Sequence, residues 1–117
     1  MDTEAALLAF SALSQSTRLE IFRLLVRHEP DGLPAGEVAR ALELPQNTIS
    51  VHLAVLARAG LLTSQRQSRL IIYRASLERL QDLTLFLIEG CCAGRPDLSA
   101  PLFAELASSC CRGKTTS

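Results

Sequence analysis

The sequence predicts a mainly α-helical domain of the α+β class, in which several helices accompany one β-hairpin. Apolar residues recur at intervals of three and four over most of the chain, which is the spacing of a buried helical face. Residues 61–73 instead have the pattern of two short strands around a polar tip. The chain has 117 residues, of which 48% are hydrophobic. This suits one compact domain that self-association would help to stabilise.

The first predicted helix spans Thr3 to Leu13 and is apolar on more than one side. Its apolar residues include Leu7, Leu8, Phe10, Ala12 and Leu13, which do not fall on a single stripe. Such a helix needs cover beyond its own chain, and a second subunit would supply it.

A second helix is predicted from the polar segment S-Q-S-T, which begins at Ser14, to the turn E-P-D-G, which begins at Glu29. Thr17 and Glu20 have the spacing of a T-x-x-E capping box, whose side chains satisfy backbone N–H groups at a helix start. The residues expected to face the core are Leu19, Ile21, Phe22, Leu24, Leu25 and Val26.

Two further helices are predicted over residues 35–42 and from Pro45 to Gly60, joined by the tight connection E-L-P. Proline favours the first position of a helix, and glycine favours its end. Two helices joined in this way match the helix-turn-helix plan, in which the second helix enters the major groove of DNA.

A β-wing is predicted after the fourth helix, with a strand near residues 61–66, a polar tip at 67–69 and a β-branched return strand at 71–73. Together these elements make a winged helix-turn-helix with a two-stranded wing. The next helix, over residues 77–90, contains L-T-L-F-L-I and is apolar all round. We therefore expect it to be buried between subunits, so that the N-terminal and C-terminal helices form the dimer.

The DNA-binding and dimerisation domain is predicted to comprise residues 1–92, and residues 93–117 to form a tail. The segment A-G-R-P-D breaks the last long helix. Ser99 is placed to cap a short helix over residues 100–108, and the chain end is expected to be frayed.

The charges are unevenly distributed along a chain whose formal charge is zero. Residues 44–77 contain no Asp or Glu, whereas the same stretch carries Arg58, Arg66, Arg69 and Arg74. Binding of phosphates requires only a basic face on the protein. The distribution therefore predicts such a face on an otherwise neutral domain.

Candidate DNA contacts lie on the first turns of the fourth helix and in the wing. Glutamine and asparagine can form two hydrogen bonds with adenine, serine and threonine can bond bases or phosphates, and valine can contact a thymine methyl. Wing arginines suit phosphate or minor-groove contacts. His52 fits a phosphate contact or a plain surface position equally well, and Arg74 lies closer to the body of the domain. The predicted contacts are Gln46, Asn47, Thr48, Ser50, Val51, His52, Arg66 and Arg69.

Other features argue against membrane proteins and enzymes. The start M-D-T-E-A-A lacks the basic region and apolar core of a secretory signal, and no apolar run approaches the ~20 residues that span a bilayer. We expect a cytoplasmic protein with no membrane partner. A thiol phosphatase or arsenate reductase would use a C-x5-R loop, but Cys92 is followed by A-G-R-P-D. No enzymatic activity is expected, and a metallochaperone would not need the candidate DNA contacts.

Four cysteines occur as two adjacent pairs, Cys91 with Cys92 and Cys110 with Cys111. In a reducing compartment such pairs are expected to bind metals or act as redox thiols rather than to form structural disulfides. All four are candidate ligands of a thiophilic ion. Free cysteine also commonly serves as a small buried hydrophobe.

The ordered set of elements resembles the ArsR/SmtB family of metal-responsive transcriptional repressors. The resemblance rests on A-L-S-Q-S-T-R-L-E-I-F-R-L-L, I-S-V-H-L-A-V-L-A-R-A-G-L-L and R-Q-S-R-L-I-I-Y-R, and it covers about Leu7 to Cys92. It implies a homodimer that binds operator double-stranded DNA when free of ligand. It also implies release of that DNA when a metal or metalloid binds.

Effector sites differ in position within this family. The site with cysteines at the start of the third helix is absent, because Pro34, Gly36 and Ala39 stand there. A zinc site of the family's last-helix type is not expected, because the two histidines, His28 and His52, lie elsewhere.

Thiolates are the donors that remain, and they favour soft or thiophilic ions. The chain resembles arsenic-responsive members with a Cys-Cys pair after the final helix, which implies trivalent arsenic as the inducer. Arsenite would engage three thiolates and a monosubstituted organoarsenical two, and both stay open. Sensing of cadmium or antimony, or a redox-sensing repressor with reversible disulfides, would use the same cysteines.

Overall fold

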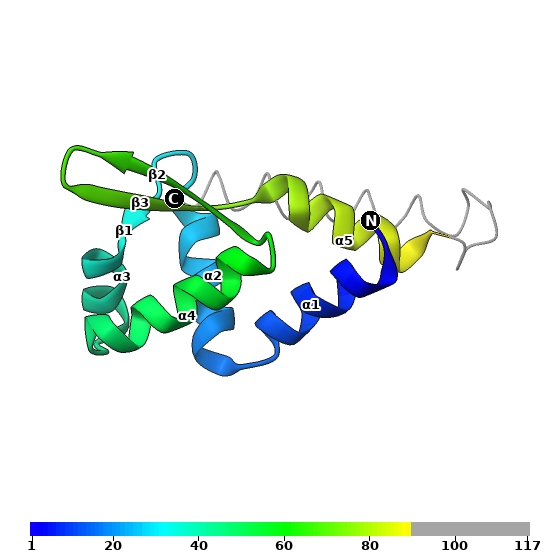
Figure 1. Cartoon of the computed structure of the whole chain (residues 1–117), viewed down its shortest axis with the longest axis horizontal. Coiled ribbons are helices and arrows are strands. Elements are labelled where there is room, and N and C mark those ends of the chain that lie inside the picture. Colours follow the sequence, from blue (N-terminus) through cyan, green and yellow to red (C-terminus); the bar gives the residue numbers. More distant parts are fainter. Residues whose placement is uncertain (90–117) are drawn as a thin grey trace. The chain divides into compact units, whose positions relative to one another are not determined.

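The computed structural model describes residues 1–89, which form helices and one small antiparallel sheet (Figure 1). The elements in chain order are α1 (Thr3–Leu13), α2 (Ser16–Arg27), β1 (Leu33–Pro34), α3 (Ala35–Leu42), α4 (Gln46–Arg58), β2 (Leu62–Gln67), β3 (Leu70–Ala75) and α5 (Leu77–Ile88). Met1–Leu83 form one compact unit, and a second begins at Thr84. The short helix expected over residues 100–108 lies outside the described residues, as do all four cysteines.

The predicted winged helix-turn-helix is confirmed. Helices α3 and α4 form the two-helix motif, and β2 and β3 form the wing, a long hairpin that Figure 1 shows beside α3. The limits expected for the helices from their apolar spacing and end signals agree closely with those observed. Local sequence patterns therefore specify most of this fold.

The sheet has three strands rather than the two of the predicted wing, in the order β1-β3-β2. Leu33 and Pro34 of β1 pair with Tyr73 and Ile72 of β3. A two-residue strand is too short to show the alternation by which strands are recognised. Strand β1 joins the segment between α2 and α3 to the wing, so the wing is anchored to the body of the domain.

The core is built around α4, which Figure 1 shows lying across α2. The largest fully buried side chains are Ile21, Leu25, Val38, Ile49, Leu53, Leu56 and Leu61. Three of them belong to α4, whose buried face repeats at the helical period. The inner face of α4 is therefore fixed by packing, and its outer face is presented to solvent.

Helix α2 begins differently from the predicted capping box. Gln15 is its N-cap residue, and the Gln15 Oε1 atom accepts a hydrogen bond of 2.9 Å from the backbone N–H of Arg18. Thr17 lies inside the first turn and not at the N-cap position, so the predicted capping box of Thr17 with Glu20 is wrong. Leu19, expected to face the core, is 43% exposed.

Helix α1 packs on the domain through small residues and carries larger ones outward. Ala6, Ala9 and Ala12 are buried, whereas Leu7 and Leu8 are 61% and 49% exposed. The prediction that α1 is apolar on more than one side is confirmed, and its outward side lacks cover within the described residues.

Glu43 occupies a position at the end of α3 that favours glycine. Its φ angle is 56°, and the Leu44 N–H bonds the Ala39 carbonyl oxygen while the Glu43 N–H bonds that of Arg40, as in a Schellman motif. Because glycine adopts this conformation without steric cost, Glu43→Gly is expected to raise the free energy of unfolding by about 0.5–1 kcal/mol. Urea denaturation measures this. Glu43→Ala removes the same charge but keeps the unfavourable φ, and an equal gain in that variant would contradict the backbone explanation.

Candidate nucleic-acid interface

The first turns of α4 present polar side chains on the face opposite the core. Ile49 and Leu53 are fully buried, while Ser50 and Val51 point to solvent, Val51 with 63% of its surface exposed. Gln46, Asn47 and Thr48 are also exposed. The structure thus places the predicted base-contacting residues on one accessible surface.

Two of these residues already have neighbours within the protein. Asn47 Oδ1 accepts a hydrogen bond of 3.0 Å from the Thr48 N–H, which is a local contact at the helix start. Gln46 lies against α3, since a Cβ atom added to Gly36 would be 3.4 Å from Gln46 Oε1. The N-cap residue, Pro45, offers no side-chain bond to the first turn. Thr48, Ser50 and Val51 consequently have the side chains most available for an external partner.

His52 is less accessible than its neighbours on α4. Its side chain is half-buried, and His52 Nδ1 lies 3.4 Å from Arg18 Nη1 of α2. The structure therefore gives His52 a partner inside the domain, which the sequence did not predict.

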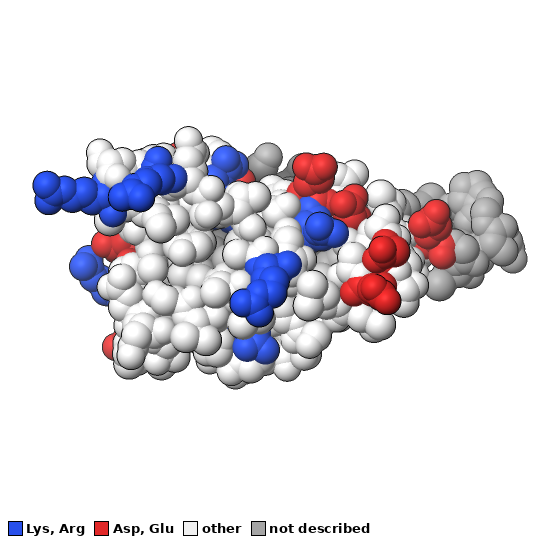
Figure 2. Space-filling view, viewed as in Figure 1, with Lys and Arg blue, Asp and Glu red and all other residues white. Residues whose placement is uncertain are grey.

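The wing carries exposed arginines near its tip. Arg66 and Arg69 are both exposed, and Arg66 Nε donates a 3.4 Å hydrogen bond to the Ser68 carbonyl oxygen. Within the described part of the chain, neither arginine forms an ion pair with a carboxylate. Figure 2 shows basic side chains projecting at the upper left, where the wing lies in the same view of Figure 1. Both guanidinium groups are therefore exposed and have no carboxylate partner in the described residues, so they can meet phosphate.

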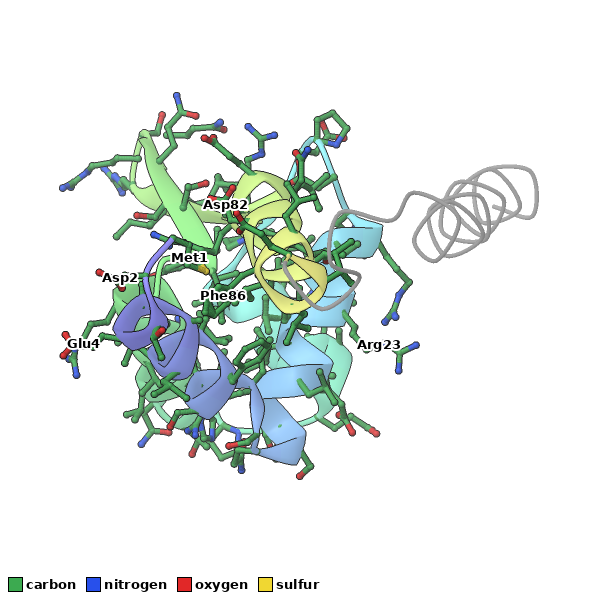
Figure 3. All side chains as sticks on the ribbon, turned by 90° about the vertical axis from the view of Figure 1, so that its right-hand side faces the viewer. Met1, Asp2, Glu4, Arg23, Asp82 and Phe86 are labelled. Atoms are coloured by element: carbon green, nitrogen blue, oxygen red, sulfur yellow. The ribbon has the colours of Figure 1, made fainter. Side chains whose placement is uncertain are left out.

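Figure 2 shows one group of carboxylates at the end of the view opposite the wing, besides others nearer to it. Asp2 and Glu4 lie at the start of α1, and Glu78 and Asp82 lie on the first turns of α5, all of them exposed. Figure 3 looks onto that end of the molecule and labels Asp2, Glu4 and Asp82. The polarity inferred from the sequence is therefore present on the folded surface.

Arg74 belongs to the framework of the domain rather than to this surface. Its Nη2 and Nε atoms donate to the two carboxylate oxygens of Glu29 at 2.8 and 3.3 Å. The hydrogen bond and the charge of Glu29 raise the pKa of Arg74 above its ordinary value. This paired arginine ties β3 to the end of α2 and is not available for phosphate.

The candidate effector ligands cannot be placed beside this surface. Cys91, Cys92, Cys110 and Cys111 all lie outside residues 1–89. Within residues 1–89 no group of three or more His, Cys, Asp or Glu side chains is arranged to hold a metal ion. No helix in the same range combines the length and apolar character needed to cross a bilayer.

Comparison with known proteins identifies the family. A helix-turn-helix domain model matches residues 13–65. An ArsR-like transcriptional regulator from Rhodococcus sp. RHA1 is 30% identical, superimposes with a TM-score of 0.64, and the match covers 90% of this chain and 89% of that one. The chain belongs to the ArsR family of transcriptional regulators.

Other similar proteins have different described roles, among them a transcriptional activator and an arsenic resistance regulator. The transcriptional activator HlyU of Vibrio cholerae is 34% identical over 71 residues, covering 61% of this chain and 63% of HlyU. One solved form, described as reduced HlyU, has 28% identity and a TM-score of 0.58, with 73% of this chain and 90% of that chain covered. The arsenic resistance regulator ArsR1 of Pseudomonas putida is 37% identical over 67 residues, covering 57% of this chain and 51% of ArsR1. The chain thus spans less than two thirds of the HlyU and ArsR1 sequences.

Proposed function

We propose that this ArsR-family regulator is a non-enzymatic, cytoplasmic repressor that binds operator DNA as a homodimer and releases it when thiolates capture trivalent arsenic. The observation that carries the DNA-binding part is the surface formed by α4 and the wing. It presents exposed polar and basic side chains from a stretch, residues 44–77, that contains no carboxylate.

The geometry of this surface suits a duplex. Thr48, Ser50 and Val51 lie on the first turns of the recognition helix α4, where base edges in the major groove are contacted. Arg66 and Arg69 lie on the wing, where they would neutralise backbone phosphates or enter the minor groove. Base contacts then give sequence preference, while wing contacts give affinity that depends on salt.

The outward side of α1 supports dimerisation. Leu7 and Leu8 are more exposed than large apolar residues of a stable monomer usually need to be. Burying them against a second copy would remove this surface from water and would pair two recognition helices for a two-fold symmetric operator.

The inducer assignment rests on the cysteine chemistry. Two vicinal thiol pairs lie at the end of the proposed DNA-binding domain, residues 1–92, and in the proposed tail, residues 93–117. Thiolates bind thiophilic ions such as trivalent arsenic, and the similarity to ArsR1 supports an arsenical ligand. Cys91 and Cys92 are proposed as the central pair, with Cys110 or Cys111 completing a three-thiolate site for arsenite.

Selection from a pool of random duplexes, followed by fluorescence anisotropy under reducing conditions, tests both parts of the proposal. Arsenite or phenylarsine oxide is expected to weaken binding between about 5- and 150-fold, the range of typical allosteric couplings. A variant carrying Cys91→Ser and Cys92→Ser is expected to bind the selected duplex normally and to ignore both compounds. Release of that variant by either arsenical would refute the thiol assignment, and selection of no duplex would refute DNA binding.

A redox-responsive regulator is the second candidate, favoured by the arrangement of the cysteines as two vicinal pairs. Disulfide formation would then replace metalloid capture as the signal. Hydrogen peroxide releasing the duplex while arsenite leaves it bound would select this candidate. Cadmium and antimonite belong in the same titration, since both are thiophilic.

A further inference from the structure

Arg18 lies in the first turn of α2 and contacts two other helices through its side chain. Its backbone N–H bonds Gln15 Oε1 at the start of α2, and its Nε donates to the Ala12 carbonyl oxygen of α1 at 2.6 Å. Its Nη1 lies 3.4 Å from His52 Nδ1 on α4. The guanidinium group of Arg18, a residue of α2, thus contacts the end of α1 and the middle of α4.

The contact at α1 is specific to a helix end. Ala12 lies in the last turn of α1, where carbonyl groups have no partner within the helix. A cation is favoured at that end because the helix dipole is negative there. Arg18 therefore stabilises the terminus of the helix whose outward face is proposed to form the dimer.

The contact at α4 is made to the imidazole ring of His52. Arginine can only donate hydrogen bonds, so in this contact the Arg18 Nη1 group is the donor and His52 Nδ1 is the acceptor. Within the described residues, α4 has no other side-chain hydrogen bond to a different element. The remaining attachments of α4 are apolar packing, which restrains sliding and rotation less directionally than a hydrogen bond.

We propose that Arg18 is a positioning residue for operator binding, which sets the orientation of α4 relative to α1 through His52. The guanidinium is planar and rigid, so its Nε and Nη1 atoms contact α1 and α4 in a fixed relative geometry. Because α1 is the proposed dimer helix, this orientation determines how two recognition helices are spaced. The inference rests on the proposed function, since it concerns DNA binding by the dimer.

Two sets of variants test the proposal by fluorescence anisotropy on two duplexes. The two-site duplex is the one selected by the wild type, and the one-site duplex is the same DNA with one half-site scrambled. Arg18→Ala and His52→Ala are each expected to weaken binding to the two-site duplex about tenfold, with less than a twofold change on the one-site duplex. In the double variant the losses should not add, because both changes break one link. Arg23→Ala, which removes an exposed α2 arginine that extends away from α4 (Figure 3), is the matched control and should change neither affinity.

Conservative variants separate positioning from stability and from direct DNA contact. His52→Asn keeps an acceptor close to the place of Nδ1 but lacks Nε2, and it is expected to retain most of the affinity lost in His52→Ala. Arg18→Lys keeps the charge at the end of α1, but its single ammonium group cannot contact α1 and α4 in the same fixed geometry. This variant should fold normally and still lose affinity for the two-site duplex.

Additive losses, or equal losses on both duplexes, would overturn the positioning role. So would an Asn variant as weak as the Ala variant, which would indicate that His52 contacts phosphate directly. A wild-type protein that selects no duplex would instead overturn the proposed function itself, and this inference with it.

Discussion

Gly32→Ala is expected to lower the free energy of unfolding by about 3 kcal/mol or more. Gly32 has a φ angle of +74°, a conformation that alanine adopts only with strain. A Cβ atom there would lie 2.5 Å from the Tyr73 carbonyl oxygen and 2.6 Å from Arg74 Cγ. Since the first of these is a backbone atom of β3, the close approach of β1 to β3 would have to open.

Urea denaturation followed by the fluorescence of Tyr73, the one tyrosine in a chain without tryptophan, measures this effect where it arises. Gly36→Ala is the matched control. Gly36 lies within α3, and its nearest neighbour would be the flexible end of Gln46 at 3.4 Å. That variant is expected to be as stable as the wild type or more stable by up to about 1 kcal/mol. Similar destabilisation of both variants would show that the packing of β1 on β3 is not the cause.

Replacing Arg66 and Arg69 together with alanine is expected to reduce the slope of log affinity against log salt by about 2 units. Each guanidinium that meets a phosphate releases about one counterion from the duplex, so two lost contacts remove two counterions from the equilibrium. Affinity at low salt should fall at least about tenfold. Preference among duplex sequences should change little, because the recognition helix is intact.

Arg23→Ala with Arg27→Ala provides the control for this pair. Both residues are exposed on α2, and the double change removes the same charge from a helix that is not part of the recognition motif. Its salt slope should match that of the wild type. A slope reduced equally in both double variants would mean that net charge, rather than the wing, determines the electrostatic part of binding.

Local patterns in the sequence were sufficient for most of the fold. Helical spacing of apolar residues, together with Pro45 and Gly60 as end signals, gave α4 its limits, and β-branched residues gave the return strand of the wing. Strand β1 was missed because two residues carry no periodicity. The capping box at Thr17 failed because a glutamine, which is an uncommon N-cap residue, begins the helix instead.

The candidate interface was predictable in composition but not in detail. Exposure of Thr48, Ser50 and Val51 follows from the helical period once the buried face is known. The partners of His52 and Arg74 do not, because Arg18 and Glu29 are distant in sequence and meet them only through tertiary packing. Side-chain pairs of this kind leave no short-range signal, so a free arginine and a paired one look alike in a sequence.

Helix α1 buries small residues and exposes large apolar ones, which in the proposed homodimer would link the stability of the protein to its concentration. Alanines on the inner side let the helix lie close to the domain, whereas the larger Leu7 and Leu8 are exposed on the outer side of the described domain. Anything that binds the folded state stabilises it by mass action, and in the proposed homodimer the binding molecule is a second copy of the protein itself. The proposed homodimer would consequently be least stable when the protein is scarce, and a duplex that holds two copies together would promote their assembly.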